Sequence, residues 1–373
     1  MRTQRKTIAF LPAHPAQLWM LRPVADAVSD FAEIVWVLRD KDCTIALADS
    51  LGLEYTVISR AAQGLVGNAL ELAGNIFRAY RITRQRGVDL WVTKYGAANI
   101  AAFLARRISV SFNDDDADVV PVIAWTSYPF ARLVLAPQVT RMGRFAAKTL
   151  FYPAYHELFY LHPNRFTPDN SVFQELGLSP DAPFAIVRLS ALHSHHDAGA
   201  RGMDQYLLRE IMRLADTQEA KIRVFISSEK PLTAEFEPHR FSVAPERMHH
   251  ALAFAEFFVG DSQTMTAEAA VLGTPAFRLN TFVGRISYIE EMQDYGLAFG
   301  YQPGREEALL AELQNVLAMP RRRDVFQRRR TKMLSEKIDP VPWMARILRG
   351  AAGDASVDSL RRTASAETEA FIQ

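Results

Sequence analysis

The chain has little cysteine, almost no excess charge and no long hydrophobic run, and each absence narrows what it can be. Its single cysteine, Cys43, excludes an intramolecular disulfide framework and is typical of a reducing compartment. Lysines and arginines number 43 against 42 acidic residues, so the overall charge does not indicate a nucleic-acid partner. No segment approaches 18 consecutive apolar residues, and no signal-peptide stretch precedes the first predicted strand. We therefore expect a cytoplasmic protein, at most peripheral to the inner face of a membrane.

The length and the hydrophobic pattern predict two α/β domains. At 373 residues with 49% apolar content, the chain can bury two cores. Short runs of β-branched and aromatic residues alternate with longer amphipathic stretches, which predicts parallel sheets with crossover helices. Strands are expected at residues 7–13, 33–39, 55–59, 89–93, 109–113 and 133–136, and then at 184–189, 221–227, 241–243, 257–260, 276–279 and 297–301. Two sets of six strands predict two doubly wound, Rossmann-like domains.

The expected domain boundary lies in residues 160–169, which are rich in proline and asparagine and lack periodicity. We place the N-terminal domain at residues 1–160 and the C-terminal domain at residues 161–349. Residues 350–373 are small and polar, and the composition predicts a loosely attached, flexible tail.

One strand, turn and helix combination carries the clearest chemical signal. A buried strand at residues 257–260 is followed by Asp261 and Ser262, then by a helix and the turn Gly273-Thr274-Pro275. Free N–H groups and the helix dipole at such a helix start attract a diphosphate. Glu268, one turn inside the helix, could accept hydrogen bonds from both hydroxyls of a ribose. The alternative is an ordinary βαβ unit in which Ser262 and Thr264 only cap the helix.

Polar residues also follow the predicted strands of the first half, where ligands bind in open α/β sheets. His14 precedes Pro15, which suits the first turn of a helix, so His14 is either a general base or a capping residue. Asp114, Asp115 and Asp116 form a solvated loop, a catalytic or acceptor-binding carboxylate, or a metal site. The metal site is the weakest alternative because adjacent side chains diverge and no second acidic cluster supports it.

The second half repeats this arrangement. The loop after strand 184–189 contains Ser190, His193, His196 and Asp197, which suit a polar loop facing phosphate or sugar, a plain surface loop or, less well, a zinc site without cysteine. Ser227, Ser228 and Glu229 end the next strand and are expected in the same layer. Arg285 could clamp an anionic group in a bidentate manner or form a structural salt bridge.

These residues carry a resemblance to a known superfamily. The two-domain layout, with Gly260-Asp261-Ser262 leading to Glu268 and Gly273-Thr274-Pro275, resembles the GT-B enzymes, most closely the branch that contains UDP-N-acetylglucosamine 2-epimerase. Residues 39–42, 160–166, 225–229 and 282–285 are similar to a family of predicted glycosyltransferases defined only as a domain of unknown function. The resemblance covers roughly residues 8–348 and implies two Rossmann-like domains facing across a cleft.

The resemblance implies roles for matching residues. Ser262, Gln263 and Thr264 would meet the diphosphate of a nucleotide-sugar donor, and Glu268 would bind its ribose, which makes the C-terminal domain the donor side and the N-terminal domain the acceptor side. The sequence departs from the epimerases at two places: residues 192–197 replace their His-Arg-x-x-Asn block, and residues 263–265 replace their double glycine. Epimerisation is therefore disfavoured, and glycosyl transfer is expected.

The expected reaction moves a sugar, most simply from a UDP-sugar, to the hydroxyl of a glycan or lipid-linked acceptor in surface polysaccharide or glycoconjugate synthesis. His14 or one of the three aspartates would take the acceptor proton. The helix start at Thr264, with Arg285, would stabilise the leaving diphosphate in place of a metal ion, so no metal or other cofactor is expected. The alternatives are a nucleotide-sugar 2-epimerase or hydrolase of the same fold and a noncatalytic nucleotide-sugar-binding protein.

A peripheral membrane contact is a weaker hypothesis. Residues 141–152 mix basic and apolar side chains, as in peripheral enzymes that use lipid-linked acceptors, and residues 321–323 and 328–330 are two arginine triplets. The alternative for both segments is a solvated helix face.

Overall fold

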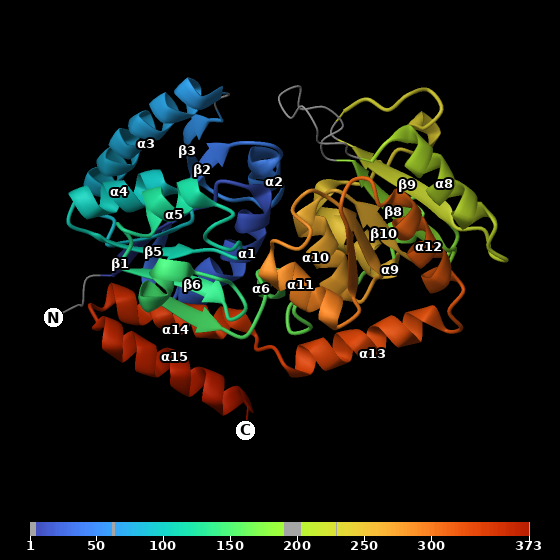
Figure 1. Cartoon of the computed structure of the whole chain (residues 1–373). Coiled ribbons are helices and arrows are strands. Elements are labelled where there is room, and N and C mark those ends of the chain that lie inside the picture. The colour runs from blue at the N-terminus through green and yellow to red at the C-terminus, as the bar shows by residue number, and fades with distance from the viewer. Residues whose placement is uncertain (1–4, 62–63, 190–202, 229, 373) are drawn as a thin grey trace. The chain divides into compact units, whose positions relative to one another are not determined.

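A computed structural model describes residues 5–61, 64–189, 203–228 and 230–372, and the chain divides into two units (Figure 1). Unit 1 consists of Met1–Asn164 and Glu336–Gln373, and unit 2 consists of Arg165–Ser335. Each unit is built on its own parallel sheet with intervening helices, so the predicted α/β fold class with two doubly wound units is confirmed.

The sheet of unit 1 has seven parallel strands in the order β3-β2-β1-β4-β5-β6-β7. The interior strand β1 is almost entirely buried, as its run Ile8-Ala9-Phe10-Leu11 requires. The strands are β1 (Lys6–Leu11), β2 (Ala32–Asp40), β3 (Tyr55–Arg60), β4 (Leu90–Thr93), β5 (Ile108–Phe112), β6 (Leu133–Pro137) and β7 (Thr149–Tyr152). All six expected strands are present, and β7 is an additional four-residue edge strand that its basic surroundings concealed.

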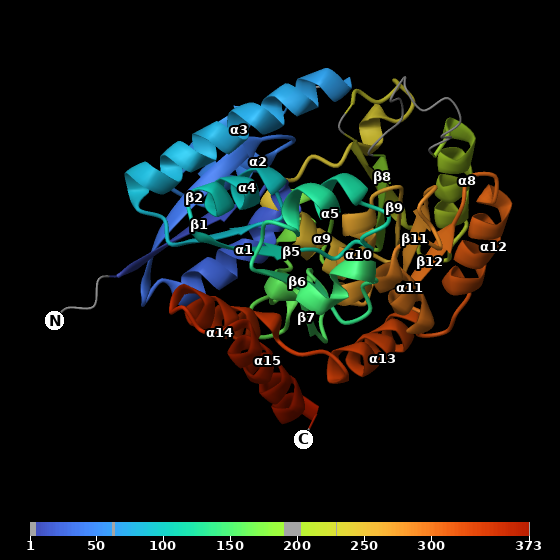
Figure 2. The ribbon, with the colours of Figure 1, turned by 60° about the vertical axis from the view of Figure 1, so that its left-hand side comes forward.

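The helices of unit 1 cover both faces of this sheet. Helices α3, α4 and α5 lie side by side, and α14 packs on α1 (Figures 1 and 2). The bounds are α1 (Pro15–Val28), α2 (Thr44–Ser50), α3 (Gly64–Arg86), α4 (Gly96–Leu104), α5 (Pro121–Ser127), the 3-10 helix η1 (Gly143–Lys148), α6 (Leu158–Leu161), α14 (Pro340–Ala352) and α15 (Val357–Ile372).

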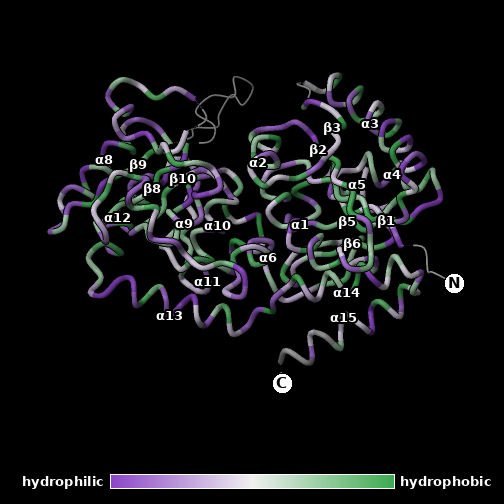
Figure 3. Tube along the Cα trace, turned by 180° about the vertical axis from the view of Figure 1, so that it is seen from behind, coloured by the Kyte–Doolittle hydropathy of each residue, from purple (hydrophilic) through white to green (hydrophobic). Residues whose placement is uncertain are grey.

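The sheet of unit 2 has five parallel strands in the order β12-β11-β10-β8-β9. They are β8 (Phe184–Leu189), β9 (Arg223–Ser228), β10 (Phe258–Gly260), β11 (Ala276–Leu279) and β12 (Ala298–Tyr301). The helices are α7 (Val172–Glu175), α8 (Gln205–Asp216), α9 (Met248–Phe254), α10 (Gln263–Leu272), α11 (Ser287–Asp294), α12 (Glu306–Leu317) and α13 (Arg322–Ser335), with 3-10 turns η2 (Glu237–His239) and η3 (Pro245–Arg247). In Figure 3, α13 has mainly the hydrophilic colour, in keeping with its six arginines and lysines.

The expected strand at residues 241–243 is wrong. Only an isolated bridge forms here, between Arg240 and Ile226, in which Phe241 donates its N–H to the carbonyl of Ile226 at 2.8 Å. It lies between Pro238 in η2 and Pro245 in η3, so too few residues remain to continue a ladder.

The C-terminal residues also differ from expectation. Residues 336–373 belong to unit 1 rather than to a C-terminal domain with a loose tail, because α14 and α15 bury apolar side chains there. Arg349 donates to the carbonyl of Ala27 at 2.7 Å, and Arg361 donates to the carbonyl of Ala147. The small, polar composition of residues 350–373 concealed the helical spacing of Leu360 and Ala364, which are both buried.

Candidate functional site

A row of residues crosses the carboxyl edge of the sheet in unit 2. The strand register places Ser227, Arg188, Gly260, Arg278 and Gly300 side by side on β9, β8, β10, β11 and β12. Lateral neighbours in a parallel sheet project to the same face, so the two arginines flank Gly260 on one face. Arg188 donates from Nη1 to Oγ of Ser227 at 2.8 Å. The row therefore brings two positive charges and no acidic residue to the edge where open α/β sheets bind ligands.

Arg278 is the unusual member of this row. The side chain is fully buried, and Nε, Nη1 and Nη2 all lack a hydrogen-bond partner among the described residues. Burial lowers the pKa of the Arg278 guanidinium, and the nearby Tyr288 and Glu290 oppose that shift only in part. Arg278 was not predicted as a site residue, although an arginine inside the apolar run Ala276–Leu279 is a recognisable signal.

Gly260 is required between the two arginines. A Cβ atom there would lie 2.8 Å from Cζ of Phe258 and 3.0 Å from Cβ of Arg188. Any larger residue would push the rigid Phe258 ring and the neighbouring strand apart, so the spacing of the row depends on this glycine.

The start of α10 follows Gly260 directly. Ser262 is the N-cap, and its Oγ accepts the N–H of Met265 at 3.3 Å. Gln263 donates from Nε2 to the hydroxyl of Tyr288 at 3.0 Å, and Thr264 is half-buried. Capping by Ser262, the alternative interpretation, is thus observed, but the Ser262 hydroxyl accepts only one of the backbone N–H groups of the first turn, that of Met265. The first-turn amides and the helix dipole still make this end of α10 attractive to an anion.

Glu268 lies on α10 and is buried. Its Oε1 is 3.0 Å from Nε2 of His249 on α9, and the His249 ring packs edge-on against Phe166. His249 was not predicted, because nothing in its sequence context links it to Glu268. The role of Glu268 in ribose binding stays a prediction, and one of its two carboxylate oxygens is already in contact with His249.

The other predicted residues of unit 2 have separate surroundings. Ser228 accepts the N–H of Lys230 at 3.2 Å and lines a cavity of about 160 Å³ at the ends of β8 and β9, beside the start of α8. Arg285 is exposed, with its guanidinium 5.7 Å from the Phe282 ring centre. Ser190, His193, His196, Asp197 and Glu229 lie outside the described residues.

His14 is the N-cap of α1 at the carboxyl edge of the sheet in unit 1. Its Nδ1 accepts the N–H of Ala16 at 3.3 Å, which confirms the capping interpretation. Its Nε2 lies 3.5 Å from Oδ2 of Asp42. A neutral ring that accepts at Nδ1 carries its proton on Nε2, where Asp42 faces it. The side chain is 42% exposed, so a capping histidine is also reachable by a ligand.

The three aspartates do not form the solvated loop that the sequence left open. Asp114 lies 3.0 Å from Nζ of Lys94 and 3.2 Å from Nδ1 of His156, and Asp115 lies 2.8 Å from the same Nζ. Asp116 is fully buried and turns away to Arg141, whose backbone N–H and guanidinium bind it.

The electrostatics of this cluster argue against Asp114 as the base. Burial disfavours its charge, but His156 and Lys94 outweigh burial and hold the pKa of Asp114 well below its usual range. Burial likewise opposes the charge of Lys94, but Asp114 and Asp115 outweigh it and raise the Lys94 pKa. A carboxylate with so low a pKa is a weak base. Among the described residues, no group of three or more histidine, cysteine or acidic side chains could hold a metal ion.

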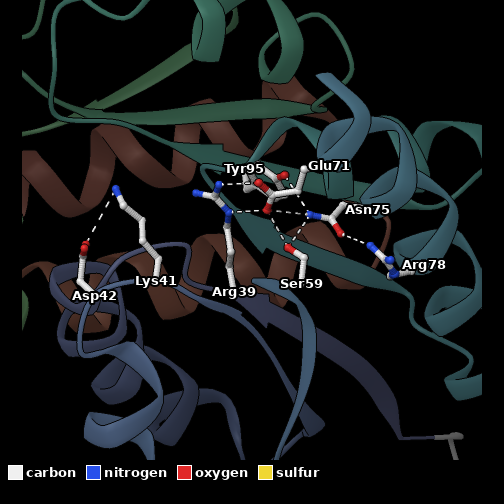
Figure 4. Close-up of polar contacts among 8 residues, drawn as sticks. All are labelled: Arg39, Lys41, Asp42, Ser59, Glu71, Asn75, Arg78 and Tyr95. Atoms are coloured by element: carbon white, nitrogen blue, oxygen red, sulfur yellow. Dashed lines mark hydrogen bonds and ion pairs between the residues drawn. The ribbon is translucent and has the colours of Figure 1, made fainter. Parts of the chain in front are cut away.

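A further polar network lies at the ends of β2, β3 and β4 (Figure 4). Arg39 makes two hydrogen bonds to Glu71 of α3, at 2.7 and 2.8 Å, and Ser59 donates to Glu71 at 2.7 Å. Asn75 donates to Ser59 at 2.8 Å and to the hydroxyl of Tyr95 at 3.0 Å. The hydrogen bonds that Arg39 donates to Glu71 raise the pKa of Arg39 against the effect of burial. The network fastens α3 to the sheet edge near Asp42, the neighbour of His14.

Comparison with known proteins supports the fold. No family model matches the chain, and no curated protein sequence matches it. Among solved structures, S. aureus MnaA with UDP has a TM-score of 0.69 at 10% identity, over 93% of this chain and 97% of that one. A putative UDP-N-acetylglucosamine 2-epimerase from Listeria monocytogenes has a TM-score of 0.67 at 10% identity, over 95% and 98%. The calicheamicin glycosyltransferase CalG4 has 0.59 at 14% identity, over 95% and 100%. The chain therefore has the GT-B fold, which the resemblance implied.

Proposed function

We propose that the protein is a metal-independent glycosyltransferase of the GT-B type that transfers a sugar from a nucleotide-sugar to an acceptor hydroxyl. The observation that carries the proposal is the row of Arg188, Gly260 and Arg278 at the carboxyl edge of the sheet, where two residues separate the end of β10 from the start of α10. Arg278 has no ion-pair partner among the described residues, and a buried guanidinium in that state is costly; an anion at the sheet edge would offset that cost.

A diphosphate is the anion that suits this place best. Its negative charge would meet the dipole and first-turn amides of α10 together with the field of Arg278, without a metal ion. The same groups would stabilise the charge that develops on the leaving diphosphate during transfer. Glu268 would hold the ribose, and Ser227, Ser228 and the exposed Arg285 would contribute polar contacts. UDP is proposed as the nucleotide because UDP is bound in the MnaA structure.

His14 is the proposed base. The acceptor hydroxyl would replace the N–H of Ala16 as the hydrogen-bond donor to Nδ1, a contact that is long at 3.3 Å. Asp42 would then stabilise the imidazolium that forms when Nδ1 takes the proton. Asp115 and Asp116 are tied to Lys94 and Arg141, so they suit structural support better than proton transfer. The acceptor would be a glycan or lipid-linked sugar used by a cytoplasmic enzyme of polysaccharide or glycoconjugate synthesis.

Epimerisation or hydrolysis is the second candidate. The compared structure from Listeria monocytogenes is a putative UDP-N-acetylglucosamine 2-epimerase, and the S. aureus MnaA structure contains UDP. The chain lacks the His-Arg-x-x-Asn block and the double glycine of the epimerases, which favours transfer.

Two measurements test the proposal. Calorimetric titration with UDP, UDP-sugars and other nucleotides should reveal one nucleotide that binds at unit 2, since a ligand that binds the native state also raises its melting temperature. Release of UDP from the bound UDP-sugar should then require an added acceptor. Release or sugar inversion without an acceptor would favour the epimerase or hydrolase, and the absence of any nucleotide binding would exclude all three functions.

A further inference from the structure

Exposed apolar side chains gather on three neighbouring helices of unit 1. Of the eleven large hydrophobic side chains that are exposed in the described part of the chain, eight lie on α3, α4 and α5. We call this surface the α3–α5 face, and it consists of Val66, Leu70, Phe77, Tyr80, Phe103, Leu104, Val122 and Trp125. Both views of the ribbon show the three helices together on one side of the sheet (Figures 1 and 2). A monomeric soluble protein rarely leaves so many large apolar groups together without a use.

Helix α3 shows that this exposure is patterned. Val66, Leu70 and Phe77 are 74%, 70% and 62% exposed, and their spacing of four and seven residues places them on one side of the helix. The buried residues Glu71 and Asn75 anchor the opposite side to the sheet edge through Arg39. The inner side of α3 also packs Ala79 and Ile82 into the core, so the exposed apolar side chains of its outer side are additional to those that fix the helix to the sheet.

The charges on this face are almost all positive. Helix α3 carries four arginines, Arg78, Arg81, Arg84 and Arg86, and one acidic residue, Glu71, which is buried against Arg39. Helices α4 and α5 carry no charged residue. Two cations lie over exposed aromatic rings: Arg81 is 5.9 Å from the Phe77 ring centre, and Arg144 is 4.9 Å from that of Trp125. The whole chain has a formal net charge of only +1, so this surplus is local.

The other basic segments are used differently. In α13, Arg322 binds Glu256, and Arg329 and Arg330 donate to the carbonyls of Gly296 and Val271 at 2.7 and 2.8 Å. These arginines hold α13 to unit 2. In residues 141–152, Arg141 holds Asp116, and only Arg144 extends to the α3–α5 face.

We propose that the α3–α5 face docks on the surface of an anionic lipid bilayer. Apolar and aromatic side chains would enter the headgroup boundary, while the surrounding arginines meet lipid phosphates and carboxylates. The contact is peripheral, since no described helix is long and apolar enough to span a membrane. This docking needs no nucleotide, so it stands or fails separately from the proposed reaction.

Sedimentation with lipid vesicles tests the docking directly. The full chain should bind vesicles of phosphatidylcholine with about one-third phosphatidylglycerol at least tenfold more tightly than pure phosphatidylcholine vesicles, and high salt should weaken this binding. Leu70→Ser with Phe77→Ser should lower the affinity at least tenfold. Arg81→Gln with Arg84→Gln should reduce the salt dependence.

A matched control distinguishes docking through this surface from nonspecific hydrophobic binding. Phe282 of unit 2 is 41% exposed and also has an arginine near its ring, Arg285 at 5.7 Å, so Phe282→Ser removes a similar group elsewhere. Phe282→Ser should bind vesicles like the parent. Circular dichroism and melting curves must show that the Leu70 and Phe77 variant is folded, and Trp125→Ala provides a second variant on a different helix.

Tryptophan fluorescence gives an independent readout. The chain has five tryptophans, and Trp125, at 55%, is the only exposed one. Brominated lipids should therefore quench part of the fluorescence of the parent and much less of Trp125→Phe. The proposal is overturned by failure to bind anionic vesicles at low salt, by unchanged binding of both apolar variants, or by variants that dissociate a dimer without changing lipid binding.

Discussion

Arg278→Met should make the ligand-free protein more stable and its nucleotide complex weaker. Methionine has a similar length and no charge, so it can fill the same enclosed space on β11. The guanidinium is fully buried, has no hydrogen-bond partner among the described residues, and has a lowered pKa because of burial. Replacing such a buried charge by an apolar side chain commonly stabilises a protein by about 1–4 kcal/mol. For a unit of this size, each kcal/mol corresponds to about 2–4 °C in melting temperature.

The effect on binding should have the opposite sign. At an effective dielectric constant of about 20, one unit charge about 8 Å from a phosphate contributes about 2 kcal/mol, which is roughly 30-fold in affinity. We therefore expect a higher melting temperature for the free variant and a UDP dissociation constant raised by about 30-fold.

The neighbouring Arg188 supplies the control. Arg188 donates to Ser227 at 2.8 Å, so Arg188→Met removes a hydrogen bond and should not stabilise the free protein, although it too should weaken UDP binding. Differential scanning fluorimetry and calorimetry on the same samples measure both quantities. If Arg278→Met lowers the melting temperature and leaves UDP affinity unchanged, Arg278 is a structural cation and the placement of the diphosphate is refuted.

Three further predictions concern the other candidate residues. Asp114→Asn should lower the free energy of unfolding by about 1.5–3 kcal/mol near neutral pH. The folded pKa of Asp114 lies below its unfolded value, so this contribution is present above the unfolded pKa and is lost as the pH falls toward the folded pKa. Urea titrations should therefore show the difference between parent and variant from about pH 5 upward and its progressive loss below about pH 4. Glu268→Gln should weaken nucleotide binding by about 1.5–3 kcal/mol per lost charged hydrogen bond. The melting temperature of the free protein should change little, because Gln can still accept a hydrogen bond from His249. A variant that binds the nucleotide with the parental affinity would remove Glu268 from the site. His14→Ala should lower turnover by about 10²–10⁴-fold and leave donor binding nearly intact. If His14→Ala keeps near-parental turnover and Asp115→Asn is inactive, the base lies in the aspartate loop instead.

The strands and the start of α10 could be predicted because local pattern determines them. Buried parallel strands have continuous apolar runs, and Ser262 and Gly273 mark the two ends of α10, with Gly273 in the left-handed conformation at φ 80°. Every strand expected in the first half is present for the same reason.

The rest depended on contacts between residues distant in sequence. The pair of Glu268 and His249, the network of Arg39 and Glu71, and the row containing Arg278 appear only when separate elements come together. The aspartates were recognised as a cluster, but their partners Lys94, His156 and Arg141 were not identified. The exposure of Val66, Leu70 and Phe77 could not be predicted either, because their spacing along α3 is that of residues on the core side of a helix.

The return of the chain to unit 1 has a consequence for protein synthesis. Unit 2 is one continuous segment, so all five strands of its sheet emerge from the ribosome before α14 does. During that time unit 1 is incomplete: its seven strands have been synthesised, but α1 is uncovered on the side where α14 later packs. The nascent chain therefore carries an apolar helix surface through the synthesis of more than 170 residues, from Arg165 to Ser335. Ribosomes that terminate just after Ser335 would release a protein whose unit 2 is complete and whose unit 1 lacks α14 and is a target for chaperones and proteases.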